Sequence, residues 1–245
     1  SPEMTLSDKA ILFDWAYTLV DLGEEDDRAP FCNMLSLLKK RAIFNGNFET
    51  IYQDYKKIFH GMIEVSRSGH REANFELVLK YLFLKYKINL EDKITLKKVL
   101  EVYYRSIYEL RDLYADVLPT LKKLQTMGIR LGIVSNTTNP EFMKDWERRY
   151  FGLDDYFEFS IYSSSMPFRK PHPSIFELAI HKLNLKPNKI LFVGDDLKVD
   201  VLGAQAVGLN AVWLNRNSLE VANGIHPDHE IKSLSEIISL LNNIG

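Results

Sequence analysis

Cysteine is almost lacking in this chain of 245 residues, which contains Cys32 alone. A single cysteine cannot form an internal disulfide, so the class of small secreted domains held together by disulfides is excluded. No apolar run approaches the roughly 20 residues that a membrane-spanning helix needs. We therefore expect a cytoplasmic protein without a membrane partner.

An excess of charge of one sign is lacking too. The formal net charge is -2, and no long basic run is present, so we expect no nucleic acid as partner. The sequence shows no internal repeat and no low-complexity segment. Residues 1–3 precede Met4, resemble the remnant of an expression tag and lack the apolar core of a signal peptide, so they are left out of the fold prediction.

Helical spacing dominates residues 24–114. Apolar residues recur there three and four positions apart, as in Phe31, Met34, Leu35 and Leu38, which is typical of amphipathic helices. Three or four helices are predicted in this region, and no strand. With 46% hydrophobic residues, the chain has enough apolar material for a sizeable core.

The rest of the chain alternates between strand and helix patterns. Strands are predicted at residues 10–13, 129–134, 190–193 and 211–214. Helices are predicted at residues 117–127, 175–183 and 201–207. Such alternation indicates a parallel sheet covered by helices. The sequence thus predicts an α/β core formed by residues 4–23 and 115–245, with residues 24–114 inserted as a helical lobe.

Carboxylates follow two of the predicted strands. Asp14 comes directly after the first strand, and Asp195 and Asp196 follow another strand after Gly194. In open α/β sheets, ligands bind beyond the carboxyl ends of the strands. Neighbouring carboxylates would repel one another there, and a divalent cation such as Mg²⁺, which prefers oxygen ligands, would relieve the repulsion. Taken singly, each aspartate is also an ordinary residue at the start of a loop.

Further polar residues lie close to the predicted strand ends. Asp200 precedes the helix predicted at 201–207, so it is either a helix N-cap or part of a metal shell, and the two roles are compatible. Ser135 and Asn136 follow a strand and could donate hydrogen bonds to a phosphate oxygen. Lys170 is followed by prolines at 171 and 173, which stiffen its loop. Its ammonium group could bind both a nucleophilic carboxylate and a phosphate.

These segments, in this order, resemble the four motifs of the haloacid dehalogenase-like (HAD) hydrolase superfamily. The matching stretches are residues 14–19, 135–136, 170–176 and 194–204. The resemblance implies a Rossmann-like core with a helical cap that closes over the site. It implies hydrolysis of a small phosphorylated substrate through an aspartyl-phosphate on Asp14. Ser135 and Lys170 would hold the phosphate, with Asn136 beside them.

The same resemblance implies a Mg²⁺ site. Asp14, Asp195 and the backbone carbonyl of Ala16 would bind the ion. Asp196 or Asp200 would complete or orient the metal shell.

The sequence departs from the superfamily at Ala16 and Tyr17. Phosphatases of the superfamily have at the first position an aspartate that transfers protons, and the second is usually glycine. General acid–base assistance contributes ~10² to 10⁴ in rate, so alanine is expected to weaken hydrolysis of esters with poor leaving groups. A phosphatase that uses good leaving groups, or takes a proton from the cap or from Tyr17, fits this pattern.

Two alternatives also fit the departure at Ala16. The segment 13–16 is similar to that of phosphonoacetaldehyde hydrolases, in which a cap lysine forms a Schiff base. Lys56 and Lys57 are the candidates here, although paired lysines usually mark a solvated helix face. The other alternative is a protein that binds a phosphorylated ligand or a partner without turnover.

The cap is expected to set the choice of substrate, because its closure excludes water and brings cap side chains onto the leaving group. Candidate contacts are Tyr52, Tyr55, Phe59, His60 and Arg67. His172, between two prolines, is interpreted as structural or neutral.

Overall fold

A six-stranded parallel sheet forms the centre of the core, in the order β5-β4-β1-β6-β7-β8. The computed structural model describes residues 8–242, and the predicted tag remnant at residues 1–3 lies outside this part. The strands are β1 (Ala10–Phe13), β4 (Arg130–Ser135), β5 (Phe159–Tyr162), β6 (Ile190–Gly194), β7 (Asn210–Leu214) and β8 (His229–Ile231). The strands predicted from apolar runs are confirmed as β1, β4, β6 and β7.

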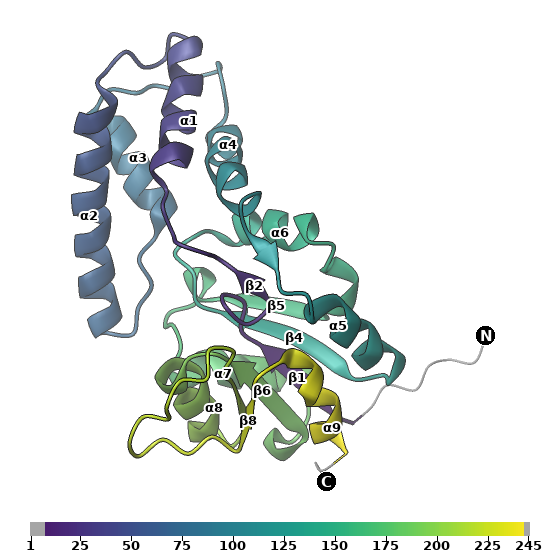
Figure 1. Ribbon diagram of the computed structural model, residues 1–245. Coiled ribbons are helices and arrows are strands. Elements are labelled where there is room, and N and C mark those ends of the chain that lie inside the picture. Colours follow the sequence, from purple (N-terminus) through teal and green to yellow (C-terminus); the bar gives the residue numbers. More distant parts are fainter. Residues whose placement is uncertain (1–7, 243–245) are drawn as a thin grey trace.

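Helices cover both faces of this sheet (Figure 1). Alternate residues of β1 point to opposite faces, because side chains alternate along a strand. Ile11 and Phe13 pack with α5 (Val117–Thr126) and α9 (Ile237–Leu241). Ala10 and Leu12 pack with α7 (Pro173–Leu183) and α8 (Gly203–Ala206). The parallel α/β class predicted from the sequence is therefore confirmed.

Short helical segments complete the core. Helix α6 (Glu141–Tyr150) follows β4. The remaining segments are the 3-10 turns η1 (Asp154–Tyr156), η2 (Ser163–Ser165), η3 (Pro187–Lys189) and η5 (Leu234–Glu236), and the π-helical η4 (Leu197–Leu202).

Four helices stand apart from the sheet and form the cap (Figure 1). They are α1 (Arg28–Lys40), α2 (Phe48–Ser68), α3 (Phe75–Lys85) and α4 (Leu96–Tyr108). Asn47, Asn74 and Thr95 cap the last three helices by accepting hydrogen bonds from backbone N–H groups of the first turn. The cap has a hydrophobic core of its own, to which Met143 of α6 contributes. The predicted helical insert is confirmed, and its boundaries at residues 24 and 114 remain a proposal.

A small antiparallel pair of strands joins the cap to the core. It consists of β2 (Val20–Asp21) and β3 (Asp112–Leu113). The prediction that residues 24–114 contain no strand is therefore wrong at its end. Strands of two residues carry too little alternation to be recognised in a sequence.

Among the described residues, no helix is both long enough and apolar enough to cross a bilayer.

Candidate active site

The carboxyl ends of three adjacent strands bring the predicted site residues together. Strand β1 lies between β4 and β6, and the N–H of Asp14 donates to the carbonyl of Val193 at 2.9 Å. Asp14 therefore follows β1 at the edge where Ser135 ends β4 and Asp195 follows β6. This placement follows directly from parallel pairing, because the carboxyl ends of parallel strands share one edge of the sheet.

Lys170 reaches this edge from the loop before α7 and is buried. Its Nζ lies 2.9 Å from Oδ1 of Asp14 and 2.7 Å from Oδ1 of Asp200. Burial lowers the pKa of this ammonium group, but the charges of Asp14 and Asp200 outweigh that effect and raise the pKa above its ordinary value. Lys170 therefore stays protonated and balances part of the negative charge.

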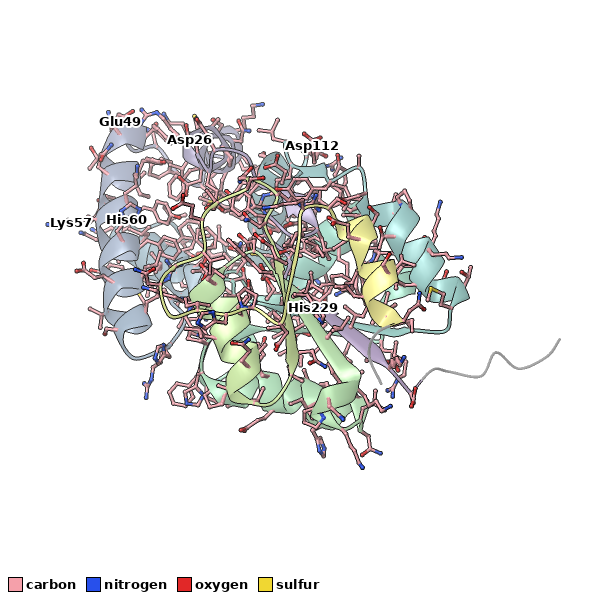
Figure 2. All side chains as sticks on the ribbon, turned by 60° about the horizontal axis from the view of Figure 1, so that its bottom comes forward. Asp26, Glu49, Lys57, His60, Asp112 and His229 are labelled. Atoms are coloured by element: carbon pink, nitrogen blue, oxygen red, sulfur yellow. The ribbon has the colours of Figure 1, made fainter. Side chains whose placement is uncertain are left out.

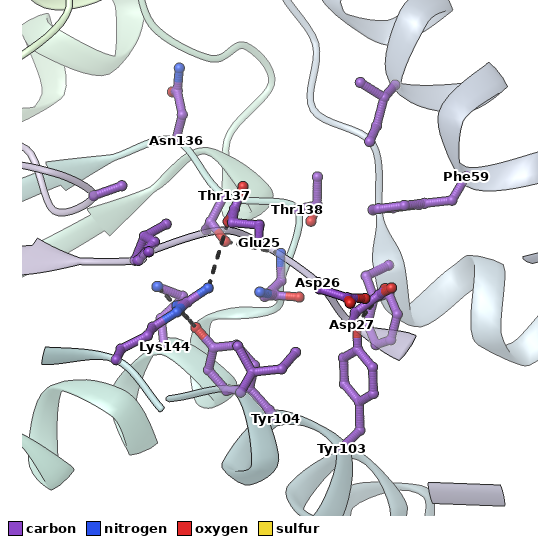
Figure 3. Close-up of a pocket in the computed structure, with 18 of the residues that line it drawn as sticks. Glu25, Asp26, Asp27, Phe59, Tyr103, Tyr104, Asn136, Thr137, Thr138 and Lys144 are labelled. Atoms are coloured by element: carbon purple, nitrogen blue, oxygen red, sulfur yellow. Dashed lines mark hydrogen bonds and ion pairs between the residues drawn. The ribbon is translucent and has the colours of Figure 1, made fainter. Parts of the chain in front are cut away.

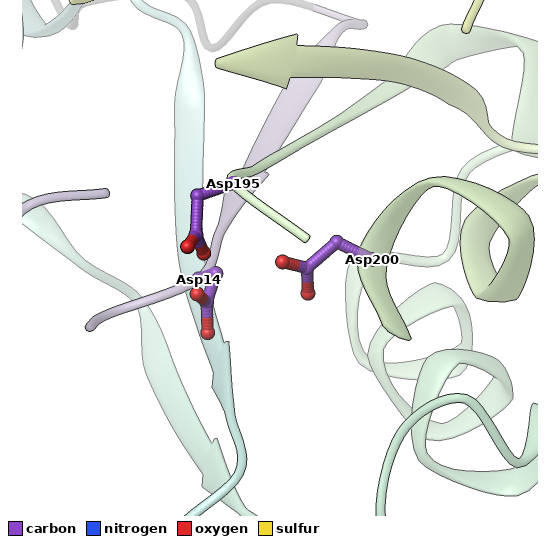
Figure 4. A group of neighbouring side chains, drawn as sticks. All are labelled: Asp14, Asp195 and Asp200. Carbon is purple, nitrogen blue, oxygen red and sulfur yellow. The ribbon is translucent and has the colours of Figure 1, made fainter. Parts of the chain in front are cut away.

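Three carboxylates surround one point at this edge. Asp14, Asp195 and Asp200 each offer an oxygen within 4.8 Å of the others, and Figure 4 shows the three side chains converging. Burial and the charges of Asp14 and Asp200 raise the pKa of Asp195 to about 9. Burial and the charge of Asp14 raise the pKa of Asp200 to about 7. One lysine does not balance this group, so the donor set fits a hard divalent cation.

Of the two roles considered for Asp200 from the sequence, that of helix N-cap is not the one the structure shows. The helix predicted at 201–207 is a π-helical turn, η4, followed by α8, and Asp200 lies inside η4. Its Oδ2 accepts a hydrogen bond from the N–H of Asp196 at 3.2 Å. A Cβ at Gly194 would overlap the Asp200 carboxyl group, so glycine is needed there for a close side-chain approach.

Asp196 takes the capping role instead. Its Oδ1 accepts hydrogen bonds from the N–H groups of Lys198 and Val199, at 2.9 and 2.8 Å. The side chain is exposed and is not part of the three-carboxylate group. Of the two alternatives left open by the sequence, the structure brings Asp200 to the group and leaves Asp196 outside it, because the Asp196 carboxylate binds its own loop.

Ser135 and Asn136 lie beside Lys170. Ser135 is buried at the end of β4, and its hydroxyl lines the cavity described below with one weak contact, 3.4 Å to the carbonyl of Asn136. The Asn136 side chain binds the main chain of Lys170: its Nδ2 donates to the Lys170 carbonyl at 3.0 Å and its Oδ1 accepts from the Lys170 N–H at 2.9 Å. We expect Asn136 to position Lys170, with Ser135 free to bind a ligand.

A cavity of about 680 Å³ lies between cap and core (Figure 3). The core contributes Ala16, Ser135 and Asn136. The candidate cap contacts predicted from the sequence all line it, namely Tyr52, Tyr55, Phe59, His60 and Arg67. The cavity has the size of ordinary small-molecule sites, roughly 300–1,000 Å³.

The cap wall of the cavity is fixed by an aspartate. Tyr52, Tyr55 and Tyr103 donate their hydroxyl hydrogens to the carboxylate of Asp27, at 2.6, 2.9 and 3.1 Å. Figure 3 shows Tyr103 beneath Asp27. These tyrosines are thus held in place before any ligand arrives.

Ala16 and Tyr17 form the loop beyond Asp14 and line the cavity. Tyr17 has a φ of 59°, in the left-handed region that favours glycine. Its hydroxyl donates to the carbonyl of Gly23 at 2.9 Å. The ring is thereby tied to the linker that enters the cap, and the methyl group of Ala16 has no atom that could transfer a proton.

His172 has the structural role interpreted from the sequence. It precedes α7 as its N-cap, with Nδ1 accepting from the N–H of Ser174 at 3.2 Å, and its ring stacks on Phe168.

A buried charged group at the junction of cap and core was missed by the sequence reasoning. Glu147 of α6 accepts hydrogen bonds from Trp15, Lys144, Arg111 and Tyr104. Lys144 also donates to Tyr104 (Figure 3). The i, i+3 spacing of Lys144 and Glu147 was the one signal in the sequence, and the remaining partners come from distant segments.

The profile of the family described as haloacid dehalogenase-like hydrolase matches residues 9–208. The chain belongs to this family. A glyceraldehyde 3-phosphate phosphatase of Pyrococcus furiosus is 27% identical over 237 residues, which cover 95% of this chain and 92% of the relative. Family membership therefore extends over both cap and core.

Solved structures of the family share the fold of this HAD hydrolase. A 2-haloacid dehalogenase from Pseudomonas syringae pv. Tomato superposes with a TM-score of 0.73 at 22% identity, covering 97% of this chain and 99% of that one. The HAD hydrolase YfnB of Bacillus subtilis, solved bound to magnesium, gives 0.61 at 23% identity, covering 96% and 98%. The likeness of segment 13–16 to phosphonoacetaldehyde hydrolases stays a prediction from that segment.

Proposed function

We propose that this HAD hydrolase is a Mg²⁺-dependent phosphatase that acts on a small phosphorylated metabolite through an aspartyl-phosphate on Asp14. The observation that carries the proposal is the placement of Asp14: its carboxylate contacts Lys170, joins two further carboxylates, and lies at the same strand edge as Ser135, which lines the cavity. The Pyrococcus furiosus relative, a phosphatase of a small phosphorylated metabolite, supports the same class of substrate.

The Asp14 carboxylate would be the nucleophile. One of its oxygens attacks phosphorus, the bond between phosphorus and the ester oxygen breaks, and an aspartyl-phosphate forms while the leaving group departs as an oxyanion that takes its proton from solvent water. Water then attacks the phosphorus, the bond to Asp14 breaks, and phosphate and the free carboxylate are restored. Lys170, held by Asn136, would orient Asp14 and bind a phosphate oxygen, and Ser135 would donate to another.

The metal would be held by Asp14, Asp195 and the backbone carbonyl of Ala16. Asp200, both of whose carboxylate oxygens already accept hydrogen bonds, would complete or orient this shell. When bound, the cation supplies positive charge against the carboxylates and the phosphate.

A substrate screen with and without Mg²⁺ tests this function. Aryl phosphates, alkyl phosphates and phosphonoacetaldehyde are offered to the wild-type chain and to Asp14→Asn. We expect phosphate release from phosphate esters with Mg²⁺ present, and none from Asp14→Asn. Cleavage of phosphonoacetaldehyde, with borohydride trapping an adduct on Lys56, would instead establish the phosphonatase alternative; of the two lysines considered from the sequence, Lys57 lies outside the cavity.

A second candidate function is binding without turnover. It is favoured by one observation, namely that Ala16 lines the cavity with a methyl group, at the position where the superfamily resemblance implies an aspartate. If inorganic phosphate binds to the chain but no ester is hydrolysed under any condition of the screen, this second function replaces the first.

A further inference from the structure

A row of basic side chains lies on one face of α2. Lys56, His60 and Arg67 are spaced four and seven residues apart, a spacing that places them above one another on a helix. All three line the cavity between cap and core. Their helix forms part of the cap wall of that cavity, together with residues of α3 and α4.

We propose that Lys56, His60 and Arg67 form a second anion-binding site, which holds an acidic group of the substrate remote from the phosphoryl group that Asp14 attacks. The inference rests on the proposed function, and it narrows the substrate class to metabolites with two anionic groups. The second group is a phosphate or a carboxylate, since both present oxygen acceptors to ammonium, imidazole N–H and guanidinium donors.

The first support is that these three side chains have no counter-charge. Within residues 8–242, none of them makes an ion pair or a side-chain hydrogen bond, and the Nζ of Lys56 lies over the ring face of Tyr52, 5.6 Å from the ring centroid. The other cations of the cavity, Lys144 and Arg111, are paired with Glu147. Among the basic side chains of the described residues that line the cavity, those without an ion pair therefore all belong to α2.

The acidic residues that line the cavity do not neutralise this row. They come from the linker before α1, where the oxygens of Asp27 accept hydrogen bonds from three tyrosine hydroxyls. Glu25 of the same linker lies 3.7 Å from Arg111. The Asp27 carboxylate lies against α2 through the hydroxyls of Tyr52 and Tyr55 and makes no ion pair with Lys56 or Arg67, so these basic groups stay available to an anion.

The size of the cavity supports a ligand with two ends. About 680 Å³ is shared by the row on α2 and by Ser135 at the core end. A ligand with a single phosphate on a short chain would fill a small part of this space. A ligand that contacts both walls would gain charge-assisted hydrogen bonds at each end.

Lys57 provides a matched control on the same helix. It lines a separate hollow on the outer side of the cap, together with Asp54, Met62 and Lys85. Figure 2 shows it at the outer edge of α2. Lys57→Gln therefore removes the same charge as Lys56→Gln, from the same helix, without altering the cavity.

The test measures binding by calorimetry in the full chain carrying Asp14→Asn, which we expect not to turn over its ligands. The ligands are inorganic phosphate, glycerol 3-phosphate, phosphoglycolate with its additional carboxylate, and a sugar bisphosphate. We expect one of the last two classes to bind about tenfold or more tightly than glycerol 3-phosphate, because one charge-assisted contact contributes that much. Tighter binding of phosphoglycolate would identify a carboxylate as the second group, and tighter binding of the sugar bisphosphate would identify a phosphate.

Single substitutions on α2 then show which side chains are responsible for the higher affinity of the two-anion ligand. Lys56→Gln, His60→Gln and Arg67→Gln should each reduce the affinity for the two-anion ligand severalfold, and leave that for glycerol 3-phosphate unchanged. Lys57→Gln should alter neither. Equal affinity for ligands with one and two anions, or an equal loss in Lys57→Gln, would overturn the second site.

The outcomes separate this inference from the proposed function. If wild type hydrolyses singly phosphorylated esters while two-anion ligands gain nothing, the phosphatase stands and the second site is refuted. Two-anion ligands could instead bind more tightly than glycerol 3-phosphate, lose this advantage in the α2 variants, and yet not be hydrolysed by wild type. In that case the second site stands and the phosphatase is refuted. Failure of every ligand to bind overturns both.

Discussion

The side-chain amide of Asn136 holds both polar groups of the Lys170 main chain, as donor at 3.0 Å and as acceptor at 2.9 Å. Asn136 follows β4, and Lys170 precedes α7, 34 residues later. This pair of hydrogen bonds fixes the loop whose ammonium group contacts Asp14 and Asp200. The position of the Lys170 ammonium group thus depends on the side-chain amide of Asn136, which binds the Lys170 main chain.

Asn136→Ala is expected to lower kcat about tenfold or more, because it releases the Lys170 loop and leaves two partly buried backbone groups without a partner. The unfolding free energy should fall by about 1–3 kcal/mol. Steady-state kinetics and urea unfolding measure the two effects. The affinity for Mg²⁺, whose proposed ligands are untouched, is the control and should stay constant. Unchanged kcat would show that Lys170 is held without Asn136.

Removal of the Lys170 charge is expected to destabilise the fold. Lys170→Met leaves Asp14 and Asp200 close together without their shared cation, and breaking a buried ion pair in this way costs about 3–5 kcal/mol. Adding Asp200→Asn removes one of the unbalanced charges and should restore part of the loss. A double-mutant cycle by urea unfolding measures the coupling. Strictly additive effects would contradict the interpretation.

Two adjacent aspartates allow a sharp test of the metal site. Asp195 belongs to the three-carboxylate group, whereas the Asp196 side chain caps η4. Calorimetric titration of Mg²⁺ should show a loss of affinity of at least tenfold in Asp195→Asn and little change in Asp196→Asn. Mg²⁺ should also raise the melting temperature of wild type by mass action, and of Asp195→Asn far less. Equal affinity in wild type and Asp195→Asn would remove Asp195 from the site.

Much of the fold and the central site could be predicted from the sequence, because their signals are local. The apolar runs of β1 and β6 mark buried parallel strands, and the residue after such a strand lies at the ligand-binding edge. That reasoning placed Asp14 and Asp195 at one edge, where the structure has them. The helical spacing likewise predicted the cap.

The features of the site that could not be predicted from the sequence depend on contacts between residues far apart in the chain. Asp200 resembles an N-cap by position, but the chain forms a π-helical turn from Leu197, so the cap falls on Asp196 and Asp200 is free to meet Lys170. The partners of Glu147 include Trp15 and Tyr104, which are 132 and 43 residues away. No spacing rule links such residues before the fold brings them together.

The buried Glu147 predicts acid sensitivity of the cap–core junction. Burial raises the pKa of this carboxyl, but the charges of Lys144 and Arg111 outweigh it and lower the pKa to about 2 from an ordinary 4.5. A carboxyl whose pKa is lowered on folding stabilises the fold above its unfolded pKa, and that stability is lost as the pH falls from about 4.5 to about 2. The loss should amount to about 3 kcal/mol.

Urea unfolding between pH 2 and pH 6 measures this loss. In Glu147→Gln the free energy of unfolding should be lower at pH 6 and its dependence on pH should be weaker, since the titrating group is gone. Glu109→Gln, which removes an exposed partner of Arg105, is the control and should keep the wild-type slope. A Glu147→Gln protein with the full wild-type slope would assign the acid sensitivity to other carboxyl groups.

The backbone conformation of Tyr17 affects which side chains can be placed at the neighbouring position 16. A φ of 59° costs a residue with a Cβ roughly 1–2 kcal/mol, and the hydrogen bond from its hydroxyl to Gly23 helps to hold that conformation. Glycine would accept the same φ without strain. Any attempt to place an acid at position 16 therefore needs to consider Tyr17.

The replacement of Ala16 by aspartate should supply the proton donor that the superfamily resemblance implies at this position. Wild type is expected to prefer aryl phosphates, whose leaving groups depart unprotonated, over alkyl phosphates, which need an acid. Ala16→Asp, alone or with Tyr17→Gly, should raise kcat/KM for alkyl phosphates about tenfold or more and for aryl phosphates less. Asp14→Asn in the same background should abolish both. If wild type already hydrolyses alkyl phosphates at about 1 to 10³ s⁻¹, another residue supplies the proton and this account of Ala16 is wrong.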